Sequence, residues 1–340
     1  MKPGMGASVT PAALSSLWQR VKHSTSSWSS GGLGVVCAKE IGDHTSSIRF
    51  LILFLLVGIT GLSSMYVGAQ SIRETVAQEG SHFVFLRLFT TSGSLPPFIA
   101  FVSFLGPLVG LAMGFDAIVG ERTRGTLSRL LSQPIYRDDV INGKFLAGIS
   151  MLGWMMGSLG LLVAGLGLIL TGVPPTTEEV VRVLAYLVVT VIYVAFWLAL
   201  GILFSVIFRQ AASSALAGIA VWLFFAVFAR LLAGLIADTF FPVTQDTPVD
   251  VALRNARWHL GLARLSPTVL YEEAIITLLN PSIRTLGPFL LEQVQGAIAG
   301  FLSPGQSLLL VWPHLVTLVA LTAGVFGVAY YLFIRQEIRA

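Results

Sequence analysis

The chain has little charge and almost no cysteine. Only 11% of its 340 residues are Asp, Glu, Lys or Arg, whereas soluble domains carry about 25%. Its one cysteine, Cys37, excludes a disulfide within the chain and gives no indication of an oxidising compartment. Apolar residues are in excess, with 55% hydrophobic side chains and a mean hydropathy of +0.81. This composition indicates a membrane protein.

Motifs of catalysis are also missing. The chain has no G-x-x-x-x-G-K-[ST] phosphate loop, and its nearest match, Gly143-Lys144, lacks both the upstream glycine and the following hydroxyl. It has no G-x-S-x-G and no H-E-x-x-H, and its five histidines follow no metal-ligand spacing. Its basic residues form no continuous stripe, so nucleic acid is not an expected partner. We expect no enzyme activity, no metal site and no cofactor bound by this chain.

What the sequence does contain is a set of six charge-free intervals, each long enough for the roughly 20 apolar residues of a spanning helix. They cover residues 50–72, 88–115, 145–177, 183–208, 210–229 and 293–334. We trimmed them at glycine, proline and polar clusters, including a break at Ser303-Pro304-Gly305. The predicted helices then cover residues 48–68, 97–115, 145–171, 183–208, 212–236 and 310–334. The predicted fold class is therefore an all-α membrane protein with six transmembrane helices.

Charge asymmetry predicts the orientation. With both termini in the cytoplasm, ten basic residues lie on that side: Lys39, Arg49, Arg122, Arg124, Arg129, Arg137, Lys144, Arg209, Arg335 and Arg339. The short external loops then carry only Arg73, Arg87 and Arg182. The positive-inside rule favours this arrangement, and the loop 237–309 is too long to count against it. We expect a multi-pass protein of the plasma or inner membrane with cytoplasmic termini.

Two segments precede the first span. Residues 1–33 include the Ser-rich stretch HSTSSWSSGG, which cannot bury much apolar area, and we expect them to form a flexible cytoplasmic N-terminus. In the next stretch, GVVCAKEIGDHTSSIRF, one helical face carries Cys37, Ala38, Ile41 and Ile48, and another carries Glu40, Asp43, His44 and Ser47. This pattern fits a helix lying in the cytoplasmic membrane surface, and it fits equally an extension of the first span.

The segment 237–309 is predicted as an external loop with two short helices. The first has Ser266 as N-cap and Pro267 at its first position, and it ends at Asn280-Pro281. The second is PFLLEQVQGAIAGFLSPG. Both are amphipathic enough to pack on the outer rim of the membrane or on a partner subunit, or to form a lid over the bundle, and the sequence does not choose among these.

Within the predicted spans, only Arg230 is charged away from a helix end. Ion-coupled carriers normally use titratable groups or broken helices near the midplane, so this pattern argues against such a carrier. Small residues recur instead: Gly106, Gly110 and Gly114 in the second helix, and Gly153 and Gly157 in the third. We interpret both sets as helix packing surfaces within one chain, in preference to a subunit interface.

Charge is concentrated at residues 120–139, GERTRGTLSRLLSQPIYRDD. Leu127, Leu130 and Leu131 form one apolar stripe, and Arg122, Arg124 and Arg129 point elsewhere. Thr126 can cap the start of a short amphipathic helix, Pro134 can end it, and Asp138 or Asp139 can cap the helix that follows. Arginines in a cytoplasmic loop also fix topology and meet anionic headgroups, which alone would explain the charge.

The order of residues in this loop resembles the type-2 permeases of ABC transporters, in the branch that includes the permease of the nitrous-oxide-reductase maturation transporter. The matching positions are Asp116, Glu121, Gly125, Thr126, Leu127, Leu130, Leu131, Pro134, Ile135, Arg137, Gly143 and Lys144. AKEIGDHTSSIRF is similar to the elbow helix before the family's first span, and LSPTVLYEEAI to its external segment before the sixth.

The resemblance implies that the loop is a coupling helix, which rests in a cleft of a separate ATPase subunit that binds ATP and Mg²⁺. The unit would hold two permease chains, expected as a homodimer, and two ATPases, and would export its substrate. Leu127, Leu130 and Leu131 would make apolar contacts, and Glu121, Arg122, Arg124 and Arg129 polar contacts, to the ATPase or to membrane lipids. Asp116 and Arg137 would brace the loop. An ion-coupled secondary transporter and a membrane scaffold that recruits envelope proteins are the alternatives.

Overall fold

The computed structural model describes residues 31–76, 83–90, 96–133, 135–172, 174–244, 247–288 and 300–336. Within these ranges the regular structure is helical, with no strand. The predicted flexible N-terminus lies outside the described residues except for its last three positions, and most of the second predicted external helix lies outside them as well. The predicted all-α class is confirmed.

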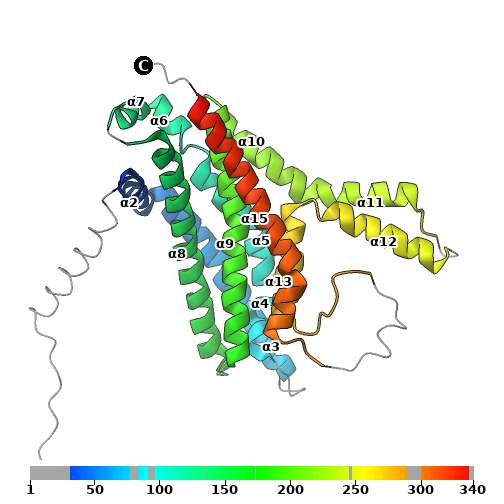
Figure 1. Cartoon of the computed structure of the whole chain (residues 1–340). Helices are drawn as coiled ribbons and strands as arrows, with labels where there is room; N and C mark the ends of the chain where they lie inside the picture. Colours follow the sequence, from blue (N-terminus) through cyan, green and yellow to red (C-terminus); the bar gives the residue numbers. More distant parts are fainter. Residues whose placement is uncertain are drawn as a thin grey trace, which may run out of the picture.

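Six helices are long and apolar enough to cross a membrane, as predicted. They are α3 (Ile48–Val76), α5 (Phe98–Gly114) with the residues that follow it, α8 (Arg137–Thr171), α9 (Thr177–Ile207), the run from α10 (Ala211–Leu223) to α11 (Ala229–Phe240), and α15 (Pro304–Arg335). Figure 1 shows that α2 (Gly32–Thr45), α6 (Val119–Thr123), α7 (Thr126–Leu131) and the last turn of α15 lie at one end of the bundle, here called the loop end.

Three helices, α8, α9 and α15, begin earlier than predicted, because polar residues form their first turns. α15 begins at Pro304, where the Ser303 hydroxyl accepts from the Gln306 N–H and the Gln306 side chain accepts from the Ser303 N–H. The turn signal at Ser303 is therefore a helix start. α8 begins at Arg137, so Asp138 and Asp139 lie in its first turn and are not caps. Carboxylates there interact favourably with the helix dipole.

The centre of the bundle is α9, which packs against α5, α8, α13 (Pro267–Leu279) and α15. A Cβ atom on Gly110 would lie 2.6 Å from the Val194 carbonyl oxygen, and one on Gly114 would lie 2.6 Å from that of Leu198. Gly106 has the same neighbour helix, since its Cβ would lie 3.1 Å from the Val194 side chain. This glycine row lets α5 approach α9 closely, as predicted.

The second glycine pair does not pack in this way. Nothing lies within 4 Å of a Cβ placed on Gly153 or on Gly157 of α8, so the prediction that they pack against another helix of this chain is wrong. A repeat of small residues shows only that a close approach is sterically allowed, and α8 makes its close approaches elsewhere. At Gly143 a Cβ would lie 2.7 Å from the Val36 side chain of α2, and at Gly148 it would lie 2.6 Å from Leu198 of α9.

The fifth crossing is not one straight helix. Between α10 and α11 lies a π-helical turn, η1 (Phe224–Phe228), and Figure 1 shows α11 running out sideways with α12 (Val249–Ala263) returning beside it. The Phe225 ring lies 6.5 Å from that of Trp197, which precedes the end of α9 at Ile207 by ten residues. Ten residues correspond to about 15 Å, half of the hydrocarbon thickness. The run therefore turns aside about a third of the way along α9 from its end at Ile207, at a depth near the middle of the membrane.

The segment α13 continues this crossing. It runs antiparallel to α9, since the Tyr193 hydroxyl donates to Thr268 over 3.2 Å, and Tyr271 and Thr190 hydroxyls lie 2.9 Å apart. Its predicted ends, at Ser266 and Asn280, are confirmed. Its predicted place, on the rim of the bundle or as a lid, is wrong, because most of its large apolar side chains are buried inside the bundle: Val269, Leu270, Tyr271, Ile275, Leu278 and Leu279.

Buried polar contacts tie α13 to its neighbours. Glu273 of α13 accepts from Arg264 over 2.8 Å and lies 2.7 Å from Nε2 of His314 on α15, and Glu272 pairs with Arg230. Near the far end, Arg182 is 1% exposed and donates to the Leu278 carbonyl and to Ser307. The glutamates made this segment look solvent-exposed in the sequence, but each is neutralised by a cation in the fold.

A small helix, α4 (Val84–Thr90), completes the described structure near the far end of the bundle, and the sequence did not predict it. Its Phe85, Leu86 and Phe89 side chains are buried, and the Phe85 N–H donates to the Glu179 carboxylate over 3.0 Å. The same carboxylate caps α9 through Thr176. α4 therefore packs against the N-terminal end of α9.

The glycine row allows a test with a matched control. We expect Gly110→Ala to lower the free energy of unfolding by about 1–3 kcal/mol, because the new methyl group meets the backbone of α9. Gly153→Ala makes the same chemical change in open space and should leave stability unchanged or slightly raised. Thermal unfolding of both variants in detergent measures this. Equal shifts would contradict the α5–α9 packing.

Candidate functional site

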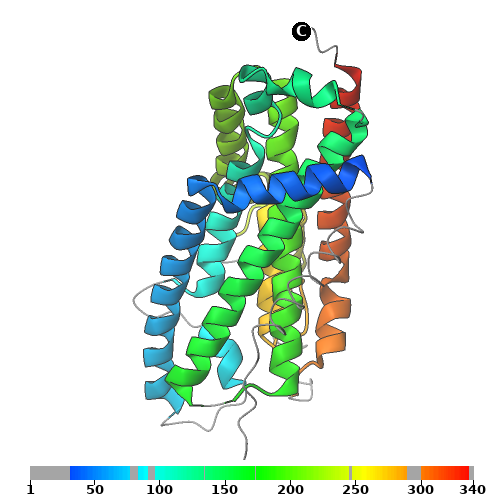
Figure 2. The same cartoon turned by 90° about the vertical axis from the view of Figure 1, so that its left-hand side faces the viewer.

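The loop end is organised by α2, which lies across the bundle. α2 ends at Thr45, Ser46 and Ser47 follow, and α3 begins at Ile48. Figure 2 shows α2 running transversely in front of the upright helices. Of the two predicted arrangements, the structure therefore has a separate elbow helix, and not an extension of the first span. Gly143 permits the contact, since α8 meets α2 at Val36 there.

One residue of the predicted polar face of α2, Glu40, points into the protein. Val36 and Glu40 are the buried residues of α2. Glu40 was predicted to lie on a face away from the apolar one, which in a lone surface helix would point to water. It lies inside because a cation on α8 meets it there. Side-chain chemistry on another helix thus decides which face of α2 is buried.

That cation is Lys144, the centre of an ion network between three helices. Its Nζ atom lies 2.8 Å from Oε1 of Glu40 on α2 and 2.8 Å from Oε1 of Glu121 on α6. The Lys144 side chain is 4% exposed and each glutamate side chain is 10% exposed. Lys39 adds a second ammonium, 3.0 Å from Glu40 and 3.6 Å from Glu121. The network joins the loop to both the elbow helix and α8.

The network favours the charged forms of Glu40 and Lys39. Burial alone would raise the pKa of Glu40, but the ammonium groups of Lys144 and Lys39 hold that pKa below its usual value. Burial would lower the pKa of Lys39, yet hydrogen bonds to Glu40 and Asp43 raise it above its usual value. Since the pKa of Glu40 falls on folding, its contribution to stability is present at neutral pH and is lost as the pH falls toward that lowered pKa.

The loop itself turns at Gly125, between α6 and α7. Gly125 has φ +67° and is the N-cap residue of α7. This left-handed conformation favours glycine. The prediction that Thr126 caps α7 is wrong, because its hydroxyl donates backwards to the Glu121 carbonyl over 3.3 Å. At the other side of the turn, the N–H groups of Ile118 and Val119 both donate to Ser205 of α9 over 2.9 Å.

Two leucines of the stripe pack into the chain. Leu127 is 1% exposed, and the half-buried Leu130 packs against the same core. Leu131 lies in α7, and Pro134 lies outside the described residues. Leu127 and Glu121 therefore contact other helices of this chain in this conformation, and their contact with a partner stays a prediction. The exposed positions are instead Thr123, Arg124, Gly125, Thr126, Ser128, Arg129, Ser132 and Gln133.

The two predicted bracing residues act separately. Asp116 pairs with Arg49 at the start of α3. Arg137 donates to the backbone carbonyl of Gln336 over 3.1 Å, just after α15. Gln336 also accepts from Arg122 and donates to the Val206 carbonyl over 2.8 Å. Sequence reasoning missed Gln336 and Ser205, since a lone Gln or Ser carries no motif.

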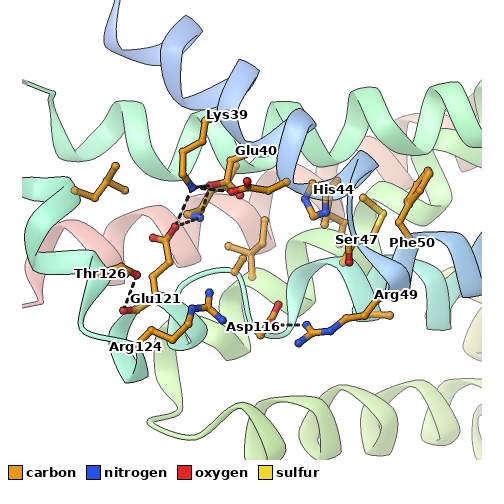
Figure 3. A pocket seen from close by; sticks show the side chains of 18 of the residues that line it. Lys39, Glu40, His44, Ser47, Arg49, Phe50, Asp116, Glu121, Arg124 and Thr126 are labelled. Carbon is orange, nitrogen blue, oxygen red and sulfur yellow. Dashed lines mark hydrogen bonds and ion pairs between the residues drawn. The ribbon is translucent and has the colours of Figure 1, made fainter.

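A cavity of 610 Å³ lies among these elements (Figure 3). α2 and the start of α3 form one side, and the end of α5 with α6 and α7 forms another. Its lining includes the ion network, the Arg49–Asp116 pair, and Arg124 and Arg129 of the loop. The predicted loop residues are thus gathered around one charged cavity at the loop end.

Comparison with known proteins agrees with this arrangement. Two relatives are described as probable ABC transporter permease protein NosY. The one from Stutzerimonas stutzeri is 27% identical over 139 residues, which are 41% of this chain and 46% of that protein. The one from Pseudomonas aeruginosa is 32% identical over 111 residues, 33% of this chain and 36% of that protein. The matched region thus spans less than half the length of either relative.

The family comparison covers much more of the chain. The model of the ABC-2 family transporter protein matches residues 35–338. This range begins in α2, includes the loop α6–α7 and all six apolar helices, and ends beyond Gln336. The chain therefore belongs to the ABC-2 family of transporter proteins.

Proposed function

We propose that this chain is the transmembrane permease subunit of an ABC exporter, driven by ATP hydrolysis on a separate subunit. The observation that carries the proposal is the loop α6–α7, which presents an exposed polar surface and is fixed to α2 and α8 by a buried ion network. The relatives' printed names support the permease role. The working unit would contain two copies of this chain and two ATPases, which bind ATP and Mg²⁺.

The contacts of the loop suggest how motion would travel. A displacement of α7 by the ATPase would act on α2 and α8 through Lys144, and on α3 through the Asp116–Arg49 pair. It would reach the end of α15 through Gln336, which bonds Arg122. Because packed and ion-paired elements move as units, the displacement would reach several helices together. The membrane would be the inner or plasma membrane, with the loop end in the cytoplasm.

The first prediction concerns docking. Ser128 is exposed on α7 and lines no part of the cavity. We expect Ser128→Trp to abolish or strongly weaken assembly with the cognate ATPase, since a bulky side chain would fill the docking surface. Ser282, exposed beyond α13, provides the control Ser282→Trp. Co-purification and ATP turnover measure the effect. Normal assembly of the Ser128→Trp variant with the ATPase would rule out this docking face.

The purified chain alone, without the ATPase subunit, should not hydrolyse ATP.

The second prediction concerns the ion network. Lys144→Met leaves Glu40 and Glu121 buried without their shared cation, which should lower the free energy of unfolding by about 3–5 kcal/mol. The triple variant Lys144→Met, Glu40→Gln, Glu121→Gln removes the unpaired charges and should recover most of that loss. If the network transmits motion, the triple variant will bind the ATPase and yet lose the permease-dependent change in ATP turnover. Wild-type turnover in the triple variant would limit the network to stability.

One observation favours an ion-coupled carrier as a second candidate. His314 lies ten residues into α15, about 15 Å from its start, and pairs there with Glu273. Sequence reasoning argued against a carrier, while keeping it as an alternative, because it found neither titratable groups nor broken helices near the midplane. Ionisable residues at that depth are often functional.

A flux assay separates the two candidates. Under the ABC proposal, liposomes that hold this chain alone and a pH-sensitive dye should take up protons no faster than empty ones, because Arg264 and His314 both hold Glu273. Glu273→Gln should leave that rate unchanged. A proton flux present in the wild-type chain and absent in Glu273→Gln would favour the carrier.

A further inference from the structure

The charged cavity at the loop end has two cations without an acidic partner. Its lining contains five Lys or Arg residues and four carboxylates. The carboxylates pair with three of the cations, through the contacts of Lys39, Lys144 and Arg49. Within the described part of the chain, the guanidinium groups of Arg124 and Arg129 have neither a hydrogen bond nor an ion pair. The cavity therefore offers two positive charges to a ligand.

Arg124 is directed into this space. In Figure 3 its guanidinium points toward the side of the cavity where Asp116 meets Arg49, and Asp116 is already engaged by that arginine. Arg129, one turn further along the loop in α7, lines the same cavity. Arginine donors in a planar fork bind phosphate oxygens in pairs. Two such groups at one cavity favour a phosphate over a single carboxylate.

The rest of the lining is apolar on one side. Phe50, Leu53 and Met113 line the cavity. Beyond it, the outer face of α3 is exposed and apolar at Ile48, Leu51 and Leu55, where lipid would surround a spanning helix. A ligand held here meets cations at one end and a hydrocarbon surface at the other. The volume of 610 Å³ is within the range of small-molecule sites, about 300–1,000 Å³, and exceeds the needs of an inorganic ion.

We propose that this cavity binds the headgroup of an anionic phospholipid, with its phosphate between Arg124 and Arg129 and its acyl chains along the outer face of α3. Basic pockets between membrane helices on the cytoplasmic side are suited to such headgroups. The bound lipid would touch both the elbow helix and the loop, and so would stabilise their junction. The site is independent of the ATPase, since it is complete within one chain.

Binding can be tested on the delipidated full chain in a neutral detergent, without the ATPase. Dioleoylphosphatidylglycerol is the probe, dioleoylphosphatidylcholine the neutral lipid, and inorganic phosphate the soluble anion. We expect phosphatidylglycerol to raise the thermal unfolding midpoint saturably, and native mass spectrometry to retain one such lipid per chain. Phosphatidylcholine should bind at least about tenfold more weakly, because it lacks the net charge. Inorganic phosphate should produce no comparable shift.

Variants identify the site. Arg124→Gln with Arg129→Gln should weaken phosphatidylglycerol binding at least about tenfold, as two charge-assisted contacts are lost. Arg209→Gln is the matched control, since Arg209 is an exposed arginine at the same end that does not line the cavity. Ala112→Phe fills the cavity without changing charge and should also weaken binding.

Three results would overturn the proposal. The first is wild-type affinity in the double arginine variant or in Ala112→Phe. The second is an equal loss in Arg209→Gln, which would indicate attraction to surface charge in general. The third is equal stabilisation by inorganic phosphate, which would indicate a site for a soluble anion.

Discussion

The loop end of this bundle depends on one buried ammonium group shared by two carboxylates. Burying an ion costs several kcal/mol unless a counter-ion accompanies it. Lys144, Glu40 and Glu121 can therefore be buried together and not singly. Because they belong to α8, α2 and α6, each helix fixes the position of the other two. Gly143, next to Lys144, allows α2 to approach α8 closely enough for the Lys144–Glu40 contact to form.

This constraint changes how the coupling loop has to be understood. An amphipathic helix with a leucine stripe resembles a free docking element whose apolar side contacts a partner. Here Leu127 and Glu121 are held by the permease, so α7 is part of the bundle and only its polar side remains free. A partner would then contact the exposed hydroxyl groups of Ser128 and Ser132, and the buried Leu127 would transmit the resulting displacement to the bundle. A displacement of α7 can move the other helices only if α7 is rigidly attached to them. A loop bound only at its ends would change shape and would not pass the displacement on.

The sequence was sufficient for features that depend on local chemistry. Charge-free intervals predicted six apolar helices, and the Ser266, Pro267 and Asn280 signals predicted α13 to the residue. It was insufficient where a side chain distant in the sequence decides whether a residue is buried. A glutamate in a sequence normally indicates a solvent-exposed position. Glu273 lies inside because it pairs with Arg264 and His314, and Glu40 lies inside because it pairs with Lys144. Gln336 and Ser205 carry no pattern at all, since their roles exist only in the folded contacts.

The bend in the fifth crossing is also linked to the pairing of buried charges. A helix that begins within a membrane, as α13 does at Pro267, leaves backbone groups without partners, and these must be satisfied by protein. The junction of η1 and α13 lies against α9, where Ser266 donates to the Phe225 carbonyl and the rings of Tyr193 and Tyr271 stack 4.1 Å apart. α13 can then carry two glutamates at membrane depth, because both find cations from neighbouring helices. A straight fifth helix would leave no room for α13 beside α9, and these acids would have no buried partners.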